Sequence, residues 1–186
     1  MTDLYQLGSD PAFEKCLPDT LIEEGGYSND AHDPGGMTME GIIQREYDKW
    51  RKDRGLPTQW VKHISPDELR TIYHDEYWLP HCPKLPAGLD LCLFDTNVNN
   101  GVHAGIILLQ RALSITSDGI WGSVTQHETD CITPDETRVL IQRFYQLRGD
   151  YYKSLRNFRY FGKDWMLRDL DIEKWALAMV DKGMIA

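Results

Sequence analysis

Hydrophobic residues recur at every third or fourth position over most of this chain, which is the spacing of one face of an α-helix. Long runs that alternate between apolar and polar residues are absent, and few β-branched residues cluster. The pattern predicts helices over these ranges: 13–24, 39–54, 65–78, 87–99, 102–114, 133–155 and 163–182. We therefore expect a mainly α fold, with at most a short β-hairpin within residues 27–38, where glycine and aspartate punctuate the sequence.

Several helix ends are marked by residues with known capping roles. The glycine pair at 25–26 should end the first helix, and Pro18 should lie near a helix start. The stretches SPDE at 65–68 and TPDE at 133–136 are capping boxes with proline at the first helical position. Two helices are therefore expected to begin at these boxes.

The composition excludes several classes of protein. The 186 residues carry a formal net charge of -9, which argues against nonspecific nucleic-acid binding and against strong attraction to an anionic membrane. No apolar run approaches the roughly 20 residues that span a bilayer, so no stable membrane insertion is expected. The N-terminal stretch lacks the basic start and apolar middle of a Sec signal, which predicts synthesis as a cytosolic chain.

The cysteines and histidines give no indication of a metal centre. The four cysteines are irregularly spaced, and no histidine pair has the spacing of a zinc helix. We expect reduced, mostly buried cysteines, no disulfide framework and no bound metal.

Candidate chemistry is concentrated in the stretch LIEEGGYSNDAHDPGGMTMEGI, residues 21–42. On a helical wheel with about 100° per residue, Glu24 falls about 20° from Leu17 and so extends the apolar stripe, whereas Glu23 falls on the flank. A carboxyl group at the apolar end of a helix loses hydration in its charged form, which suits a general acid. The alternative is that Glu24 is an ordinary residue of the last helical turn.

Two further residues of this stretch could act with Glu24. Asp33 could position water or stabilise developing positive charge, and Thr38 could assist it, as glycoside hydrolysis requires. Each also has a simpler interpretation, because Asp-Pro-Gly-Gly is a strong turn signal and Thr38 could cap the second helix.

The residues EGGYSNDAHDPGGMTMEGI resemble the signature of glycoside hydrolase family 108, the bacterial and phage N-acetylmuramidases. That signature is Glu-Gly-Gly-Tyr, a short loop, Asp-x-Gly-Gly and then Thr-x-x-Gly-Ile, and every position is present. The resemblance implies a lysozyme-like two-lobed fold, cleavage of the β-1,4 bond between N-acetylmuramic acid and N-acetylglucosamine, and no cofactor. It also implies that Glu24 is the catalytic acid. The order Glu24, Asp33, Thr38 is similar to the triad of phage-type lysozymes.

The resemblance extends to the second half of the chain. LQRALSITSDGIWGSVT is similar to the predicted peptidoglycan-binding region that follows in this family, and FGKDWMLRD is similar to the family's closing element. The segment HCPKLPAG at 81–88, rich in proline and glycine, predicts a lobe boundary. We therefore expect a catalytic lobe at residues 1–86 and a helical lobe at residues 87–186, packed as one globular unit.

A glycan-binding groove needs aromatic faces for sugar rings and amides for N-acetyl groups. The residues predicted to contact substrate are Tyr27, Asn29, Asp95, Asn97, Asn99, Gln110 and Trp121. Several have alternatives, because Asn99 could cap a helix, Gln110 could satisfy buried backbone groups, and Trp121 could simply pack in a turn.

The sequence is compatible with several reaction types and with several cellular roles. The enzyme could be a retaining or an inverting hydrolase, with carboxyl separations of roughly 5–5.5 Å or roughly 6.5–9.5 Å respectively. It could also be a lytic transglycosylase, or a catalytically inert peptidoglycan-binding or secretion-associated protein. We expect a monomer that acts on peptidoglycan glycan strands at the cell wall, in the periplasm, and reaches them through a holin, a secretion system or another non-Sec route.

Overall fold

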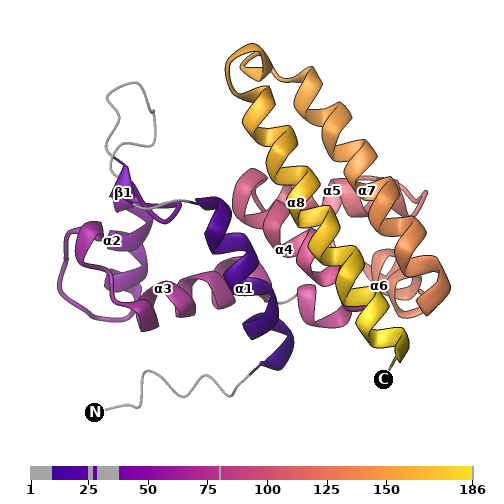
Figure 1. Ribbon diagram of the computed structural model, residues 1–186. Helices are drawn as coiled ribbons and strands as arrows, with labels where there is room; N and C mark the ends of the chain where they lie inside the picture. The colour runs from indigo at the N-terminus through magenta and orange to yellow at the C-terminus, as the bar shows by residue number, and fades with distance from the viewer. Residues whose placement is uncertain (1–9, 25–26, 29–37, 80, 186) are drawn as a thin grey trace. The chain divides into compact units, whose positions relative to one another are not determined.

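The structure is a computed structural model that describes residues 10–24, 27–28, 38–79 and 81–185. Within these ranges the fold is mainly α, as the hydrophobic pattern predicts (Figure 1). The chain divides into two compact units, Met1–Glu76 and Tyr77–Ala186. The predicted lobe boundary, between residues 86 and 87, lies within the second unit, and the roles assigned to the two lobes stay predictions.

The first unit begins with helix α1, Pro11–Glu24. The Asp10 carboxylate accepts hydrogen bonds from the backbone N–H groups of Ala12 and Phe13, which starts the helix. The helix ends immediately before the glycine pair, as expected. Pro18, however, lies in the helix interior and not near its start. Because Pro18 is exposed, water can reach the carbonyl group that the proline leaves without a donor.

A small antiparallel sheet follows α1. Its strands, in the order β1-β2-β3, are Tyr27–Ser28, Thr38–Met39 and Ile42–Ile43. The predicted helix over 39–54 is wrong at its start, because α2 covers only Gln44–Asp53. Between β2 and β3, Glu40 and Gly41 have φ angles of 47° and 77°, the positive values of a tight two-residue hairpin turn. Thr38 is therefore a residue of the central strand and does not cap α2.

The next elements of the first unit pack α2 against a third helix. The 3₁₀ turn η1, Val61–His63, precedes helix α3, Pro66–Ile72, which begins at the predicted capping box from Ser65 to Glu68. The helix then continues as a π-helical segment η2, Tyr73–Trp78. The wider π turn shifts the phase of the buried face. As a result Trp78 is buried, with 0% exposure, whereas Tyr77 is only half-buried.

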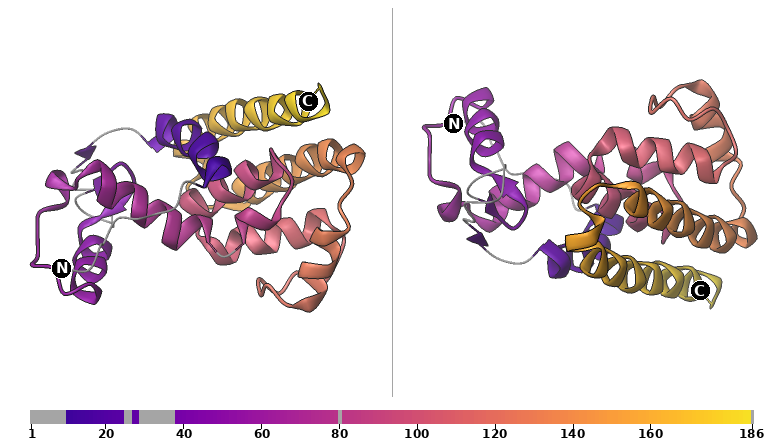
Figure 2. Two further views of the ribbon diagram at one scale, coloured as in Figure 1. Left: turned by 90° about the horizontal axis from the view of Figure 1, so that it is seen from below. Right: turned by 90° about the horizontal axis from the view of Figure 1, so that it is seen from above.

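The second unit is built around helix α4, Leu89–Asn100, which follows the 3₁₀ turn η3, Cys82–Lys84. Its nine residues from Leu89 to Asn97 are all buried, and α4 packs against α5, α7 and α8. The remaining helices are α5 (Val102–Ala112), α6 (Ser123–Asp130), α7 (Pro134–Ser154) and α8 (Phe158–Ile185). The long helices α7 and α8 lie side by side and antiparallel (Figures 1 and 2).

Candidate active site

The carboxylate of Glu24, at the end of α1, lies directly against the turn between β2 and β3. An ideal Cβ atom built on Gly41 would stand only 2.4 Å from Oε2 of Glu24 and 3.2 Å from the hydroxyl oxygen of Tyr73. The Glu24 side chain is half-buried. The absence of a side chain at Gly41 therefore lets a carboxylate and a hydroxyl approach the backbone of the turn.

Tyr73 holds this turn in place. Its hydroxyl donates a hydrogen bond to the backbone carbonyl oxygen of Glu40 at 2.6 Å, and the residue is only 1% exposed. Glu40 occupies the left-handed backbone region, which costs a non-glycine residue on the order of 1 kcal/mol. The bond from Tyr73 thus stabilises a backbone conformation that Glu40 would otherwise adopt poorly, and the turn brings Gly41 against Glu24.

The other residue of the turn, Glu40, carries a carboxyl group with a perturbed pKa. Glu40 is partly buried, and desolvation raises the pKa of its carboxyl group above the ordinary value. Nothing in the sequence pattern indicates a role for this residue.

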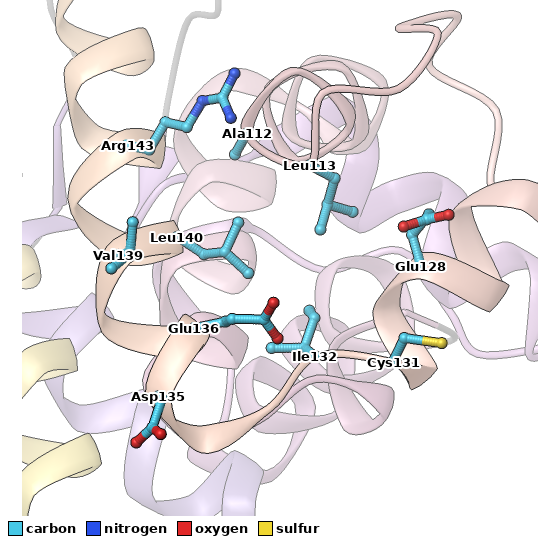
Figure 3. Close-up of a pocket in the computed structure, with 10 residues that line it drawn as sticks. All are labelled: Ala112, Leu113, Glu128, Cys131, Ile132, Asp135, Glu136, Val139, Leu140 and Arg143. Atoms are coloured by element: carbon cyan, nitrogen blue, oxygen red, sulfur yellow. The ribbon is translucent and has the colours of Figure 1, made fainter.

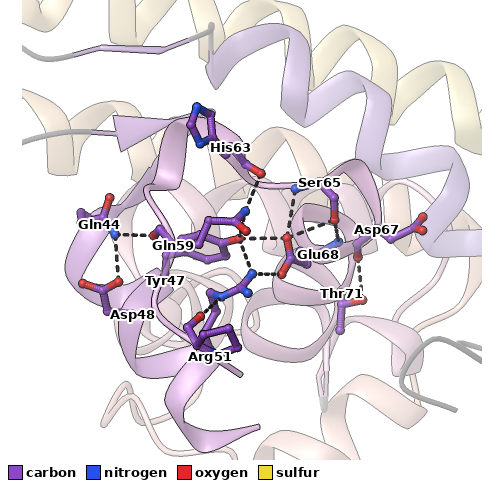
Figure 4. Close-up of polar contacts among 11 residues, drawn as sticks. Gln44, Tyr47, Asp48, Arg51, Gln59, His63, Ser65, Asp67, Glu68 and Thr71 are labelled. Carbon is purple, nitrogen blue, oxygen red and sulfur yellow. Dashed lines mark hydrogen bonds and ion pairs between the residues drawn. The ribbon is translucent and has the colours of Figure 1, made fainter. Parts of the chain in front are cut away.

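A buried polar network fixes α2 against α3 (Figure 4). Glu68 accepts hydrogen bonds from the Tyr47 hydroxyl at 2.8 Å and from the guanidinium of Arg51, and both charged side chains are nearly inaccessible to water. Gln59 donates to the Tyr47 hydroxyl at 3.0 Å. Desolvation, reinforced by Glu68, raises the pKa of Tyr47 to about 12, so its hydroxyl stays protonated. Since α2 follows β3 directly, this network supports the hairpin that contacts Glu24.

The other predicted catalytic residues belong to the same short segment. Asp33 lies outside the described residues, as does Asn29, which was predicted to contact substrate. The structure places the backbones of Tyr27 and Thr38 in the sheet, where Tyr27 is opposite Met39 and Ser28 is opposite Thr38. Thr38 therefore lies in the strand that leads into the turn at Gly41.

Asp95, by contrast, is completely buried among charged side chains of the second unit. Its carboxylate accepts hydrogen bonds from Arg148 Nη1 at 2.6 Å and from Arg168 Nη2 at 2.7 Å. Burial alone would raise the pKa of Asp95, but the two guanidinium groups outweigh it and hold that pKa below the ordinary value. Asp95 joins α4 to α7 and α8, and its carboxylate has no exposed face for a sugar.

The predicted amide contacts are also engaged within the second unit. Asn97 is 1% exposed and donates to the carbonyl oxygen of Tyr77 at 2.8 Å. Asn99 is half-buried and accepts from the Tyr152 hydroxyl at 2.8 Å. The structure therefore gives these two asparagines a role in packing α4, and we do not include them in the proposed substrate site.

Gln110 and Trp121 lie at the loop between α5 and α6. The Gln110 side chain is 1% exposed, donates to Asp118 Oδ1 at 2.8 Å and accepts from the backbone N–H of Gly119 at 2.9 Å, so it satisfies buried polar groups of the loop. Trp121 is half-buried and donates through Nε1 to Gln126 at 3.0 Å, and its ring centroid is 4.6 Å from that of His81. Of this pair, Trp121 keeps an accessible aromatic surface.

Two residues next to Glu24 were not assigned to the site from the sequence. Gly41 belongs to the Thr-x-x-Gly-Ile motif, so its presence there was a usable signal. Tyr73 fits the apolar face of its helix, and nothing in the local pattern indicates that its hydroxyl reaches Glu40. Among the described residues, no group of three or more His, Cys, Asp or Glu side chains could hold a metal ion. Over the same ranges, no helix has the length and apolar character that crossing a membrane requires.

Comparison with known proteins identifies the segment that carries this site. Eleven solved chains match, and among them the structure of Brucella abortus SagA has a TM-score of 0.78 and 27% sequence identity, covering 92% of this chain and 97% of SagA. No curated protein sequence matches significantly. Residues 17–101, which include Glu24, Gly41 and Tyr73, match the glycosyl hydrolase 108 family model. The resemblance to glycosyl hydrolase family 108 that the motifs indicate is thus confirmed over residues 17–101.

Proposed function

We propose that this protein is an N-acetylmuramidase that hydrolyses the β-1,4 bond between N-acetylmuramic acid and N-acetylglucosamine in peptidoglycan. The observation that carries the proposal is the position of Glu24, half-buried at the end of α1 and in contact with the hairpin turn at Gly41. The match of residues 17–101 to a glycoside hydrolase family supports the same reaction class.

In this mechanism Glu24 is the general acid. It donates its proton to the bridging oxygen as the glycosidic bond breaks, while positive charge develops on the sugar ring. A second group must then stabilise that charge or activate the attacking water. We assign this role to Asp33, assisted by Thr38 of strand β2.

The turn at Glu40 and Gly41 supports the acid. Oε2 of Glu24 has little freedom on the side of Gly41, because the backbone and the Tyr73 hydroxyl occupy that side. A catalytic group whose position is fixed before substrate binds loses less entropy when the transition state forms. The hairpin therefore orients the proton donor.

The products of peptidoglycan digestion test the proposal. Mass spectrometry should show reducing muramic ends, whereas anhydro-muramyl ends would indicate a lytic transglycosylase and no released fragment would indicate an inert binding protein. The Glu24→Gln variant should release no product while its thermal midpoint stays within a few degrees of the wild type. A fully active Glu24→Gln variant would refute the assignment of the acid.

The roles of Asp33 and Thr38 can be tested separately. Asp33→Asn and Thr38→Ala should each lower kcat with little change in thermal midpoint. NMR of the first anomeric product distinguishes retention from inversion, and hence a nucleophilic carboxylate from one that activates water. Unchanged kcat in Asp33→Asn would leave Glu24 as the single essential carboxyl group.

We also propose that the protein acts on the cell wall after passage through a holin or another non-Sec route. With a net charge of -9, the chain gains no electrostatic attraction to the peptide carboxylates of the wall. Recognition must then come from local stacking and hydrogen bonding. Expression with and without a holin tests the route, because lysis should require the holin.

A further inference from the structure

The second unit contains an open groove of about 420 Å³ that is not part of the proposed catalytic site (Figure 3). It lies between the end of α5, the end of α6 and the first half of α7. Its wall is aliphatic, and the side chains of Leu113, Ile132 and Leu140 point into it. Val139, which also lines the groove, is 63% exposed. An aliphatic surface of this kind favours a ligand with a hydrocarbon chain.

Charged groups of both signs border the aliphatic wall. Arg143 lies at one side of the groove, with Nη1 donating to Ser114 Oγ at 2.7 Å. Glu136 points into the groove from another side, and Glu128 lies on α6. Hydrogen bonds from the Thr133 hydroxyl and backbone lower the pKa of Glu136, so this carboxylate is ionised at neutral pH.

The aliphatic wall and the charged residues around it limit which ligands fit the groove. The groove is lined by three acidic residues, Glu128, Asp135 and Glu136, and by one basic residue, Arg143, so a polyanion would meet an excess of carboxylates and a purely apolar ligand would make no use of these charges. A ligand with an ammonium group and a carboxylate on one aliphatic chain matches all three features, because each charge then faces its opposite.

We propose that this groove binds the diamino-acid residue of a peptidoglycan peptide stem. The free ammonium group faces Glu136 and Glu128, the carboxylate faces Arg143, and the methylene chain packs on Leu113 and Leu140. The choice of a peptidoglycan peptide, in place of another diamino-acid peptide, rests on the proposed function. The groove would retain the enzyme on the wall through a part of the polymer that the glycosidase reaction does not change.

Cys131 provides a reporter of occupancy. It lines the groove and is exposed, whereas Cys16, Cys82 and Cys92 are buried. The experiment measures the rate at which N-ethylmaleimide alkylates Cys131 in the full chain. The probe is the tripeptide L-alanyl-γ-D-glutamyl-meso-diaminopimelate, which has no glycosidic bond. Saturating tripeptide should slow alkylation at least severalfold.

Two chemical controls and three variants test the charge pattern. Acetylating the side-chain amine of diaminopimelate, or replacing the tripeptide with cadaverine, should weaken protection about twofold to fivefold, the size expected for one exposed charge contact. Glu136→Gln and Arg143→Gln should weaken tripeptide binding by a similar factor. Glu136→Gln keeps the capping box, because glutamine also serves at that position. Asp130→Asn, on α6 outside the groove, should bind as the wild type does.

Each outcome decides the proposal. No protection by the tripeptide, equal protection by cadaverine, or normal binding by Glu136→Gln and Arg143→Gln would overturn it. Glycan cleavage is measured separately on intact peptidoglycan. Cleavage without tripeptide binding would refute peptide binding in the groove and leave the muramidase proposal intact. Tripeptide binding without cleavage would refute the muramidase proposal and leave peptide binding in the groove intact.

Discussion

The carboxylate of Glu24 lies in the space that a side chain at Gly41 would occupy. The ideal Cβ of Gly41 would be 2.4 Å from Glu24 Oε2, far closer than two non-bonded atoms can approach. Glu24 ends a helix and Gly41 lies in a hairpin turn, so the contact joins two elements that are separate in the sequence. The position of the proposed acid therefore depends on the residue in that turn.

Replacing Gly41 with alanine should displace Glu24. The new methyl group would collide with the carboxylate, and the φ angle of 77° would be strained for alanine. We expect a loss of stability of about 1–2 kcal/mol, and a fall in kcat of about a hundredfold because the acid is displaced. Peptidoglycan turnover and urea unfolding measure the two effects.

Gly55→Ala is the matched control for this variant. Gly55 has a φ angle of 67°, and a Cβ atom there would meet nothing within 4 Å. The Gly55→Ala variant should lose a similar amount of stability from backbone strain but retain its peptidoglycan turnover. Equal activity in the two alanine variants would show that the contact between Glu24 and Gly41 is irrelevant to catalysis.

Tyr73→Phe should loosen the same turn without altering the packing of the ring. The variant loses the hydrogen bond to the Glu40 carbonyl, which costs about 1 kcal/mol of stability. We expect kcat to fall about tenfold, because Gly41 then orients Glu24 less well, while KM changes little. Tyr160→Phe, at an exposed tyrosine of α8, should leave both quantities unchanged. An unchanged kcat in Tyr73→Phe would assign Tyr73 to packing alone.

Local signals predicted those parts of the fold that depend on neighbouring residues. The capping boxes at 65–68 and 133–136 start α3 and α7, because each box is completed within four residues. The spacing of the apolar residues Ile42, Tyr47 and Trp50 also fits a helix, so a helix was predicted where strands β2 and β3 form a hairpin. Helix α6 was not predicted, because its buried residues are threonines and give no apolar stripe.

The surroundings of the site were harder to predict, because they depend on distant residues. Glu24 was identified from its helix phase and its motif. The bond from Tyr73 to Glu40 joins residues far apart in the chain, and no periodicity reports it. Asp95 was predicted to contact substrate because it lies in a stretch of polar residues that could line a glycan-binding groove. Its partners are Arg148 and Arg168, on helices that follow much later.

The two capping boxes should respond differently to the same substitution. Glu68→Gln keeps the capping box of α3 but removes the charge that pairs with buried Arg51, which should cost about 3 kcal/mol. Glu136→Gln keeps the capping box of α7, and Glu136 is exposed, so its cost should be much smaller than that of Glu68→Gln. Urea unfolding of both variants measures the difference. Similar costs would contradict a structural role for the pair formed by Arg51 and Glu68.

Asp169 should make stability depend on pH in a direction opposite to that of an ordinary ion-paired aspartate. Its carboxylate lies 3.2 Å from Arg148 Nε, but neither of its oxygens accepts an aligned hydrogen bond. Desolvation raises the pKa of Asp169 to about 7. The positive charges of Arg148 and Arg168 oppose this shift, and the negative charges of Asp95 and Glu173 reinforce it. We conclude that burial outweighs the ion pair.

The sign of the effect follows from proton linkage. Between the ordinary pKa of 3.8 and about 7, the folded protein keeps the Asp169 proton and the unfolded chain has lost it. The stability that Asp169 contributes is therefore complete below 3.8 and is lost as the pH rises through about 7. Relative to Asp169→Asn, the wild type should lose about 2 kcal/mol between about pH 5 and pH 8. Asp164→Asn, at an exposed position of α8, should track the wild type. If urea unfolding gives the same difference between wild type and Asp169→Asn at both pH values, Asp169 is ionised throughout, and its pairing with Arg148 outweighs burial.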